Sequence, residues 1–168
     1  MIRMIPKDRL HGATPGRGTS DNQTGRFEQF QRVSVDDGWD HDLDDLAPVR
    51  TEVHIDRPRK AITRNTSPDL RFDRSVNPYR GCEHGCVYCF ARPSHAFLNL
   101  SPGLDFETRL LARPTAPNLL AHELSKPGYV PKPIAFGTNT DPYQPIEKTH
   151  EIMRCCLEVL LDFNHPVL

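Results

Sequence analysis

The pattern of apolar and polar positions separates an aperiodic N-terminal segment from a region of alternating strand-like and helix-like pieces. Over 1–49 apolar residues are sparse, and 12–25 consists almost entirely of turn-forming residues. Such a segment cannot bury enough apolar surface to offset the conformational entropy that ordering would remove. A further run, 36–45, carries six aspartates and is typical of a solvated acidic linker. We therefore predict a largely disordered, acidic N-terminal tail at 1–49 and a folded domain at 50–168.

Within the predicted domain, short apolar runs alternate with apolar residues at helical spacing. The pattern predicts strands at 51–55, 72–78, 108–112, 133–137 and 166–168, and helices at 94–100, 118–124 and 145–163. In the last helix Pro145 takes the first position, where its missing N–H costs nothing, and Glu147 faces the positive end of the helix dipole. The order of these elements is typical of a parallel α/β fold.

The distribution of charged residues limits the kinds of partner that the chain could bind. The chain has 21 Lys and Arg against 22 Asp and Glu, which excludes a globally basic nucleic-acid binder. Between 50 and 80, however, eight basic residues stand against four acidic ones. This local excess fits either a solvated sheet face or a surface for a phosphate-rich substrate. No apolar run is long enough to span a membrane and the N-terminus lacks a signal-type core, so we expect a cytoplasmic protein without a membrane partner.

Cysteine usage points to a metal centre. Three of the five cysteines, Cys82, Cys86 and Cys89, follow a C-x3-C-x2-C spacing that lets one loop aim three thiols at one centre. Gly81 and Gly85 allow the positive φ angles of such a tight turn. Thiolates select zinc or iron–sulfur centres, so the loop predicts one of these two.

The two kinds of centre differ in their fourth ligand. A structural zinc site would need His84 or a distant cysteine to close it. Cys155 and Cys156 are adjacent in a predicted helix, where they fit small core residues better than ligands. In the other interpretation the three thiols hold three irons of a [4Fe-4S] cluster, and the fourth iron stays open to a substrate or cofactor.

The residues around the loop resemble a known family. The motif Cys82-x3-Cys86-x-Tyr88-Cys89, with an aromatic residue before the third cysteine, resembles the signature of the radical S-adenosylmethionine (radical SAM) superfamily. The longer strings at 77–92 (NPYRGCEHGCVYCFAR) and 136–147 (FGTNTDPYQPIE) are similar to the spore photoproduct lyase-like group, also called DNA repair photolyases.

The resemblance implies roles for individual residues. Cys82, Cys86 and Cys89 would ligate the [4Fe-4S] cluster, S-adenosylmethionine would chelate the fourth iron, and the backbone at Tyr88 would meet the adenine. The methionine end of the cofactor would bind at the loop formed by Thr138, Asn139, Thr140 and Asp141. Much of the superfamily has Gly-Gly-Glu at this loop. Thr140 and Asp141 are the strongest candidates here, because a carboxylate is a natural partner of an ammonium group. An ordinary strand-to-helix turn is the alternative for this loop.

The resemblance also implies a fold and a reaction. The fold would be the first part of a partial (β/α)6 TIM-like barrel, with 50–168 as a radical SAM core that is incomplete at its C-terminus. The stretch from Phe72 to Leu168 suffices for only about three strand–helix units. The reduced cluster would cleave S-adenosylmethionine to a 5′-deoxyadenosyl radical that abstracts hydrogen from an unidentified substrate, for which nucleic acid is one candidate. A reducing donor of the flavodoxin or ferredoxin type would supply the electron.

Two other classes of protein remain open at this point. One is a non-catalytic zinc-binding module that contacts nucleic acid through the basic stretch 50–80. The other is an iron–sulfur protein that only transfers electrons, whose cluster would be indifferent to S-adenosylmethionine. The pattern identifies no residue that touches the substrate.

Overall fold

A computed structural model of the chain describes residues 18–19, 22–24, 26–27, 29–30 and 50–168. Most of the predicted tail, including the acidic run 36–45, lies outside these residues. Several of the residues described before residue 50 contact the folded body. The Asn22 side chain donates to Asp105 Oδ1 at 2.9 Å and accepts from the Asp105 backbone N–H at 2.8 Å, and Phe27 packs against Phe97 with ring centroids 5.2 Å apart.

The larger sheet has three strands. Their order is β1 (Glu52–Ile55), β5 (Arg109–Ala112) and β4 (Tyr79–Arg80). β1 runs parallel to β5, with Val53 opposite Leu110, and β4 runs antiparallel to β5, with Tyr79 opposite Ala112. Leu110 and Ala112 are fully buried, so the alternation of β5 places one face of this sheet in the core.

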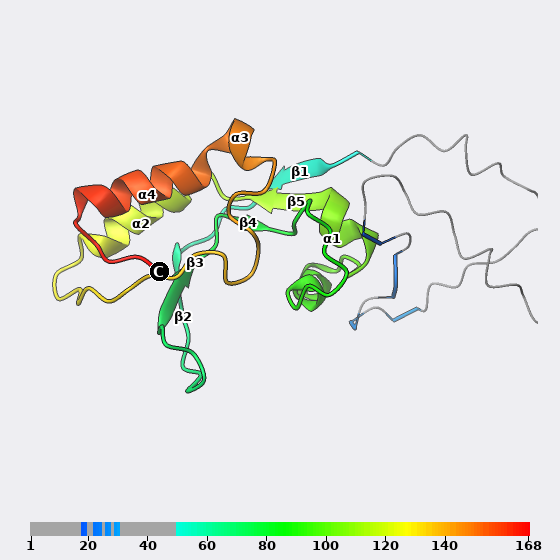
Figure 1. The fold of residues 1–168 in the computed structure, drawn as a ribbon, viewed down its shortest axis with the longest axis horizontal. Helices are drawn as coiled ribbons and strands as arrows, with labels where there is room; N and C mark the ends of the chain where they lie inside the picture. Colours follow the sequence, from blue (N-terminus) through cyan, green and yellow to red (C-terminus); the bar gives the residue numbers. More distant parts are fainter. Residues whose placement is uncertain (1–17, 20–21, 25, 28, 31–49) are drawn as a thin grey trace, which may run out of the picture.

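The smaller sheet is an antiparallel hairpin of β2 (Ile62–Arg64) and β3 (Arg74–Val76). Its connecting loop projects away from the helices (Figure 1). All three residues of β3 are buried. Ser75 also forms a parallel bridge with Ala135, and Ile134 forms one with Val167, which ties the hairpin to two later extended segments.

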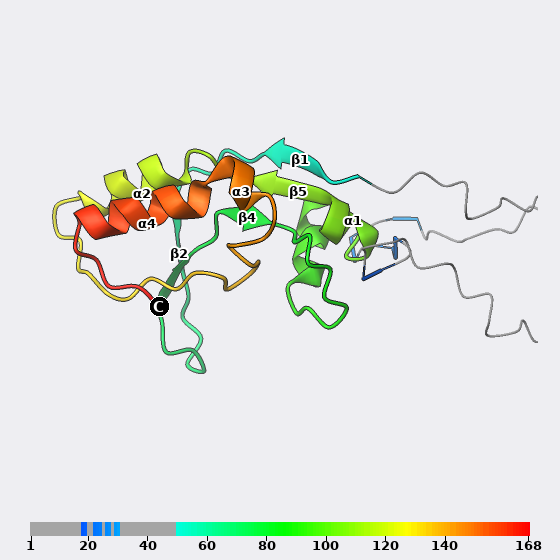
Figure 2. The ribbon, with the colours of Figure 1, turned by 45° about the horizontal axis from the view of Figure 1, so that its top comes forward.

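The described residues also form five helical elements, two of them between β4 and β5 and three after β5. They are the 3-10 helix η3 (Arg92–Leu98), α1 (Leu104–Thr108), α2 (Ala116–Leu124), α3 (Glu147–His150) and α4 (Ile152–Asp162). α2 and α4 lie side by side (Figures 1 and 2). Leu120, Cys156 and Leu160 bring their buried faces to a common core with Tyr79 of β4. Removal of this apolar surface from water stabilises the helix pair. None of the described helices is long and apolar enough to cross a membrane.

The predicted continuous helix at 145–163 is wrong, because it is divided into α3 and α4. Glu151 separates them in a left-handed conformation with φ of 49°. The Glu147 carboxylate then accepts hydrogen bonds from the backbone N–H groups of Met153, at 3.1 Å, and Arg154, at 3.0 Å. Glu147 therefore satisfies the free donors at the start of α4, not those of its own helix.

The expected first part of a (β/α)6 barrel is also wrong. The described residues form a mixed α/β structure with one sheet of three strands and one of two, and no closed barrel. The predicted strands at 133–137 and 166–168 meet their neighbours only at isolated bridges. Pro133 and Pro166 contribute no backbone donor, which limits the ladders these segments can form. Both β4 and the hairpin pair antiparallel, whereas barrel strands are parallel.

Candidate functional site

The cysteine loop leaves β4 through a sharp turn at Gly81. This residue has φ of 77°, and an added Cβ would lie 2.6 Å from Leu110 Cδ2 and 2.9 Å from the Phe106 carbonyl oxygen. The next residue, Cys82, donates its backbone N–H to that same carbonyl at 2.9 Å. Glycine is therefore required both by the backbone conformation and by the close packing of the loop on α1 and β5.

The three motif cysteines differ in exposure. Cys82 is buried, Cys89 is half-buried and Cys86 is exposed, and all three are free thiols. Backbone hydrogen bonds turn the loop twice, from Gly85 N–H to the Cys82 carbonyl at 3.4 Å and from Cys89 N–H to the Cys86 carbonyl at 3.1 Å. The loop thus presents two thiols toward the body and one to solvent.

Cys82 lies where the cysteine loop meets the loop at 138–141. Burial raises the pKa of its thiol, while backbone N–H groups of His84 and Asp141 oppose this by donating to the sulfur. The nearby Cys89 thiol also raises the pKa of Cys82. These interactions bring two predicted cluster ligands and one predicted cofactor-binding residue into one neighbourhood.

The side chains of the cysteine loop supply the donors of a metal centre but do not converge on one point. Within the described part of the chain, no group of three His, Cys, Asp or Glu side chains is close enough to hold a metal ion. Three thiols within one short loop match the chemistry of an iron–sulfur or zinc centre. The Cys86 thiol is exposed, whereas the thiols of Cys82 and Cys89 are buried and half-buried. A metal centre shared by all three therefore requires their side chains to converge when the metal binds.

Arg92 holds the backbone of the cysteine loop from its buried side, a role that no sequence pattern predicted. Its guanidinium donates to the backbone carbonyls of Cys86, at 2.9 Å, and Gly85, at 3.0 Å. It also forms an ion pair with the fully buried Glu107 and lies over the Phe106 ring. The only sequence signal for Arg92 is its position at the end of the string 77–92.

The loop at 138–141 is anchored by the residues that precede the cysteine loop. The Asn77 side chain donates to Thr138 Oγ1 at 3.2 Å and accepts the Asn139 N–H at 3.1 Å. Thr140 is buried and donates its hydroxyl to the Tyr79 carbonyl at 3.2 Å. Two hydroxyl groups predicted to bind cofactor are therefore already used in positioning the loop.

Asp141 is the exposed carboxylate of this loop. Its Oδ2 lies 3.2 Å from His84 Nε2, which links it to the cysteine loop, and its Oδ1 accepts the Tyr143 N–H at 2.8 Å. Both side chains of the His84 pair are about half exposed. The carboxylate can therefore exchange His84 for a bound cation.

Gln144 joins the cysteine loop to the segment that follows the loop at 138–141, a role that no sequence pattern predicted. Its amide N–H donates to the Gly81 carbonyl at 3.2 Å, and its Oε1 accepts the Glu83 N–H at 3.1 Å. The side chain is 1% exposed. Only the inclusion of Gln144 in the string 136–147 points to it in the sequence.

Apolar side chains cover the outer face of the cysteine loop. Val87, Tyr88 and Phe90 are 67%, 87% and 79% exposed. Tyr88 is the residue predicted to meet an adenine, and it lies on this exposed surface. The exposed apolar groups offer contact area for a flat ring.

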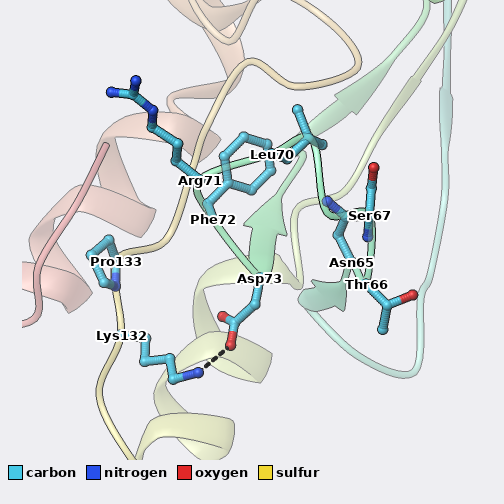
Figure 3. A pocket seen from close by; sticks show the side chains of 9 residues that line it. All are labelled: Asn65, Thr66, Ser67, Leu70, Arg71, Phe72, Asp73, Lys132 and Pro133. Atoms are coloured by element: carbon cyan, nitrogen blue, oxygen red, sulfur yellow. Dashed lines mark hydrogen bonds and ion pairs between the residues drawn. The ribbon is translucent and has the colours of Figure 1, made fainter.

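A separate open pocket of about 340 Å³ lies between the β2–β3 loop and the segment at 132–133. Figure 3 shows Lys132 reaching Asp73, with Nζ 2.7 Å from Oδ2. Arg74 and Lys132 together hold the pKa of Asp73 well below its usual range. The pocket contains none of the predicted site residues, and its one lysine is already neutralised by Asp73.

Comparisons with known proteins identify relatives without a stated function. No family model matches the chain, and no solved structure gives a significant match. Uncharacterized proteins of Mycobacterium bovis and of two strains of Mycobacterium tuberculosis are each 46% identical over 98 residues. The match covers 58% of this chain and 29% of each relative. The chain thus matches less than a third of the length of these curated relatives.

Proposed function

We propose that the chain carries the cluster-binding and cofactor-binding part of a radical SAM enzyme similar to the spore photoproduct lyase-like group. The observation that carries the proposal is the contact between two sequence motifs that lie about sixty positions apart. The Cys82 thiol neighbours the backbone of Asp141, and Glu83 is bonded to Gln144, 61 positions away. A cofactor that bridges a cluster and a binding loop needs this proximity.

In this proposal Cys82, Cys86 and Cys89 hold a [4Fe-4S] cluster. When bound, the cluster with S-adenosylmethionine supplies one-electron cleavage of the sulfonium and hydrogen abstraction from a substrate. The chain itself contributes positioning. Gly81 and Arg92 fix the two ends of the loop, and the Cys86 thiol is accessible from solvent.

The loop at 138–141 binds the methionine end of the cofactor. Asp141 is the best candidate for the ammonium group, because its carboxylate is accessible while the Thr140 hydroxyl is bonded to the Tyr79 carbonyl. Thr138 and Asn139 orient the loop through Asn77. The backbone of Tyr88 meets the adenine at the exposed apolar face.

Partners and compartment follow from the same proposal. An electron donor of the flavodoxin or ferredoxin type would reduce the cluster, and the five free thiols suit a reducing cytoplasm. Nucleic acid is a candidate substrate, because Arg57, Arg59 and Arg64 are exposed on and beside the β2–β3 hairpin.

A zinc-binding module is the second candidate. The thiols of Cys82 and Cys89 are neighbours, and Cys86 and His84 lie on the same loop, so these four residues could form a closed four-ligand site. Metal analysis after anaerobic purification separates the two candidates. Iron and sulfide with a brown absorption band support the radical SAM proposal, and stoichiometric zinc in a colourless protein contradicts it.

A further inference from the structure

Both backbone groups that flank Cys82 are bonded to a single side chain. The Gly81 carbonyl accepts from Gln144 Nε2 at 3.2 Å, and the Glu83 N–H donates to Gln144 Oε1 at 3.1 Å. The nitrogen and the oxygen of the Gln144 amide thus bind the residues immediately before and after Cys82. A buried amide with both ends satisfied is well ordered, because moving it leaves a polar group without a partner.

Gln144 is also close in sequence to the loop at 138–141. Tyr143 and Asp141 are joined by a hydrogen bond of 2.8 Å, so the segment that leads to Gln144 is a defined turn. On the far side, Thr51 Oγ1 donates to the Glu83 carboxylate at 2.6 Å. The residues on both sides of Cys82 are therefore held in place, and Gln144 adds a fully buried connection to the His84–Asp141 and Thr140–Tyr79 contacts with the cofactor-binding loop.

We infer that Gln144 is a positioning residue that locks the backbone around Cys82 to the loop at 138–141, so that both loops move as one unit. This inference rests on the proposed function. A cluster held by Cys82 would then keep a constant distance from a cofactor held at Asp141. Gln144 itself contacts neither group.

Two substitutions remove the bridge in graded steps. Gln144→Met keeps the length of the side chain and removes both hydrogen bonds. Gln144→Glu keeps the acceptor for the Glu83 N–H and loses the donor to the Gly81 carbonyl. Leu120→Ala, in the core between α2 and α4, is the control for general destabilisation because it touches neither loop.

Hydrogen–deuterium exchange on the full 168-residue chain without metal tests the connection itself. In Gln144→Met, amides at 81–84 and at 138–143 should exchange faster together, by about tenfold, which corresponds to about 1.4 kcal/mol. Gln144→Glu should lie between this variant and the wild type. Leu120→Ala should accelerate exchange in α2 and α4 instead. Faster exchange confined to 143–146 in Gln144→Met would overturn the inference.

Reconstituted protein tests the consequence for the cofactor. Gln144→Met should keep its iron content but bind S-adenosylmethionine about tenfold more weakly, as read from the change the cofactor makes in the electron paramagnetic resonance spectrum. Unchanged affinity would overturn the positioning role. Wild-type protein that takes up no iron would instead contradict the proposed function, and the exchange result would still decide whether Gln144 couples the loops.

Discussion

Arg92 and Glu107 form a buried ion pair directly beneath the cysteine loop. Their side chains are 10% and 0% exposed. The same guanidinium donates to the carbonyls of Gly85 and Cys86. The pair therefore connects α1 to the backbone of the proposed cluster loop. The buried guanidinium is paired with a carboxylate and hydrogen-bonded to two carbonyls of that loop.

Replacement of Arg92 should lower the free energy of unfolding of the chain. Arg92→Met leaves the Glu107 carboxylate buried without its cation, which costs about 3–5 kcal/mol. Urea denaturation measures the loss. Arg154→Ala removes a fully exposed pair with Glu158 and serves as the control, with no measurable change expected. The double variant Arg92→Met/Glu107→Leu should recover part of the loss, and a single variant as stable as the wild type would contradict this assignment.

Gly81 should tolerate substitution less well than Gly128. Both have φ of 77°, but a Cβ at Gly128 meets nothing within 4 Å, whereas one at Gly81 would meet Leu110 at 2.6 Å. Gly128→Ala should cost about 1–2 kcal/mol from the backbone conformation alone. Gly81→Ala should cost about 1–3 kcal/mol more, because the core must shift. Equal thermal midpoints for the two variants would show that the packing at Gly81 is not as described.

His95 should make the chain less stable at mildly acidic pH. Burial lowers the pKa of its imidazole. The hydrogen bond to the Arg109 carbonyl and the Asp105 charge oppose this lowering, and the charges of Arg80 and Arg109 add to it. The unfolded chain takes up a proton near pH 6.5 and the folded chain does so only at lower pH, so stability is present above that value and falls below it. The loss is at most about 1.4 kcal/mol per pH unit.

The variant His95→Phe keeps a ring against Phe106 and removes this titration. Its free energy of unfolding, followed by urea titration from pH 7.5 to pH 5, should fall less steeply than that of the wild type. His122→Ala, on the exposed side of α2, should follow the wild-type slope. Parallel curves for His95→Phe and the wild type would refute the role of His95.

Local patterns predicted several elements, and long-range pairing explains the failures. The alternation at 51–55 and the apolar run at 108–112 correctly predict β1 and β5, and helical spacing correctly predicts most of α2 and buries Cys156 in the core of α4. The sheet partners were not predictable in this way. Antiparallel pairing of β4 with β5 depends on a contact between distant segments, and the barrel expectation failed at that level.

The candidate site also contains residues that local sequence patterns predict and residues that depend on long-range contacts. Spacing and residue type single out the cysteines, and the resemblance of 136–147 to the spore photoproduct lyase-like group singles out the loop at 138–141. Arg92, Glu107 and Gln144 act through buried hydrogen bonds to backbone carbonyls or to each other, and such roles have no characteristic spacing. The break at Glu151 was missed because a cap supplied by Glu147 across the helix boundary cannot be distinguished by pattern from a first-turn carboxylate.

The cysteines should separate into two functional groups. Cys86→Ala should abolish iron binding, because a cluster with an open iron needs all three motif thiols. Cys155→Ala and Cys156→Ala should retain the iron of the wild type, since both lie in α4 and Cys156 is fully buried in the apolar core. Iron and sulfide assays on anaerobically reconstituted proteins measure this. Loss of iron in either α4 variant would place a ligand in that helix.

The electron paramagnetic resonance spectrum of the reduced, anaerobically reconstituted protein, recorded with and without S-adenosylmethionine, tests the proposed function most directly. The proposal predicts about four irons per chain and a spectrum that changes when the cofactor is added, because the cofactor chelates the open iron. A four-iron cluster whose spectrum ignores the cofactor would indicate electron transfer alone, and zinc in place of iron would indicate a binding module. Either result would contradict the radical SAM proposal.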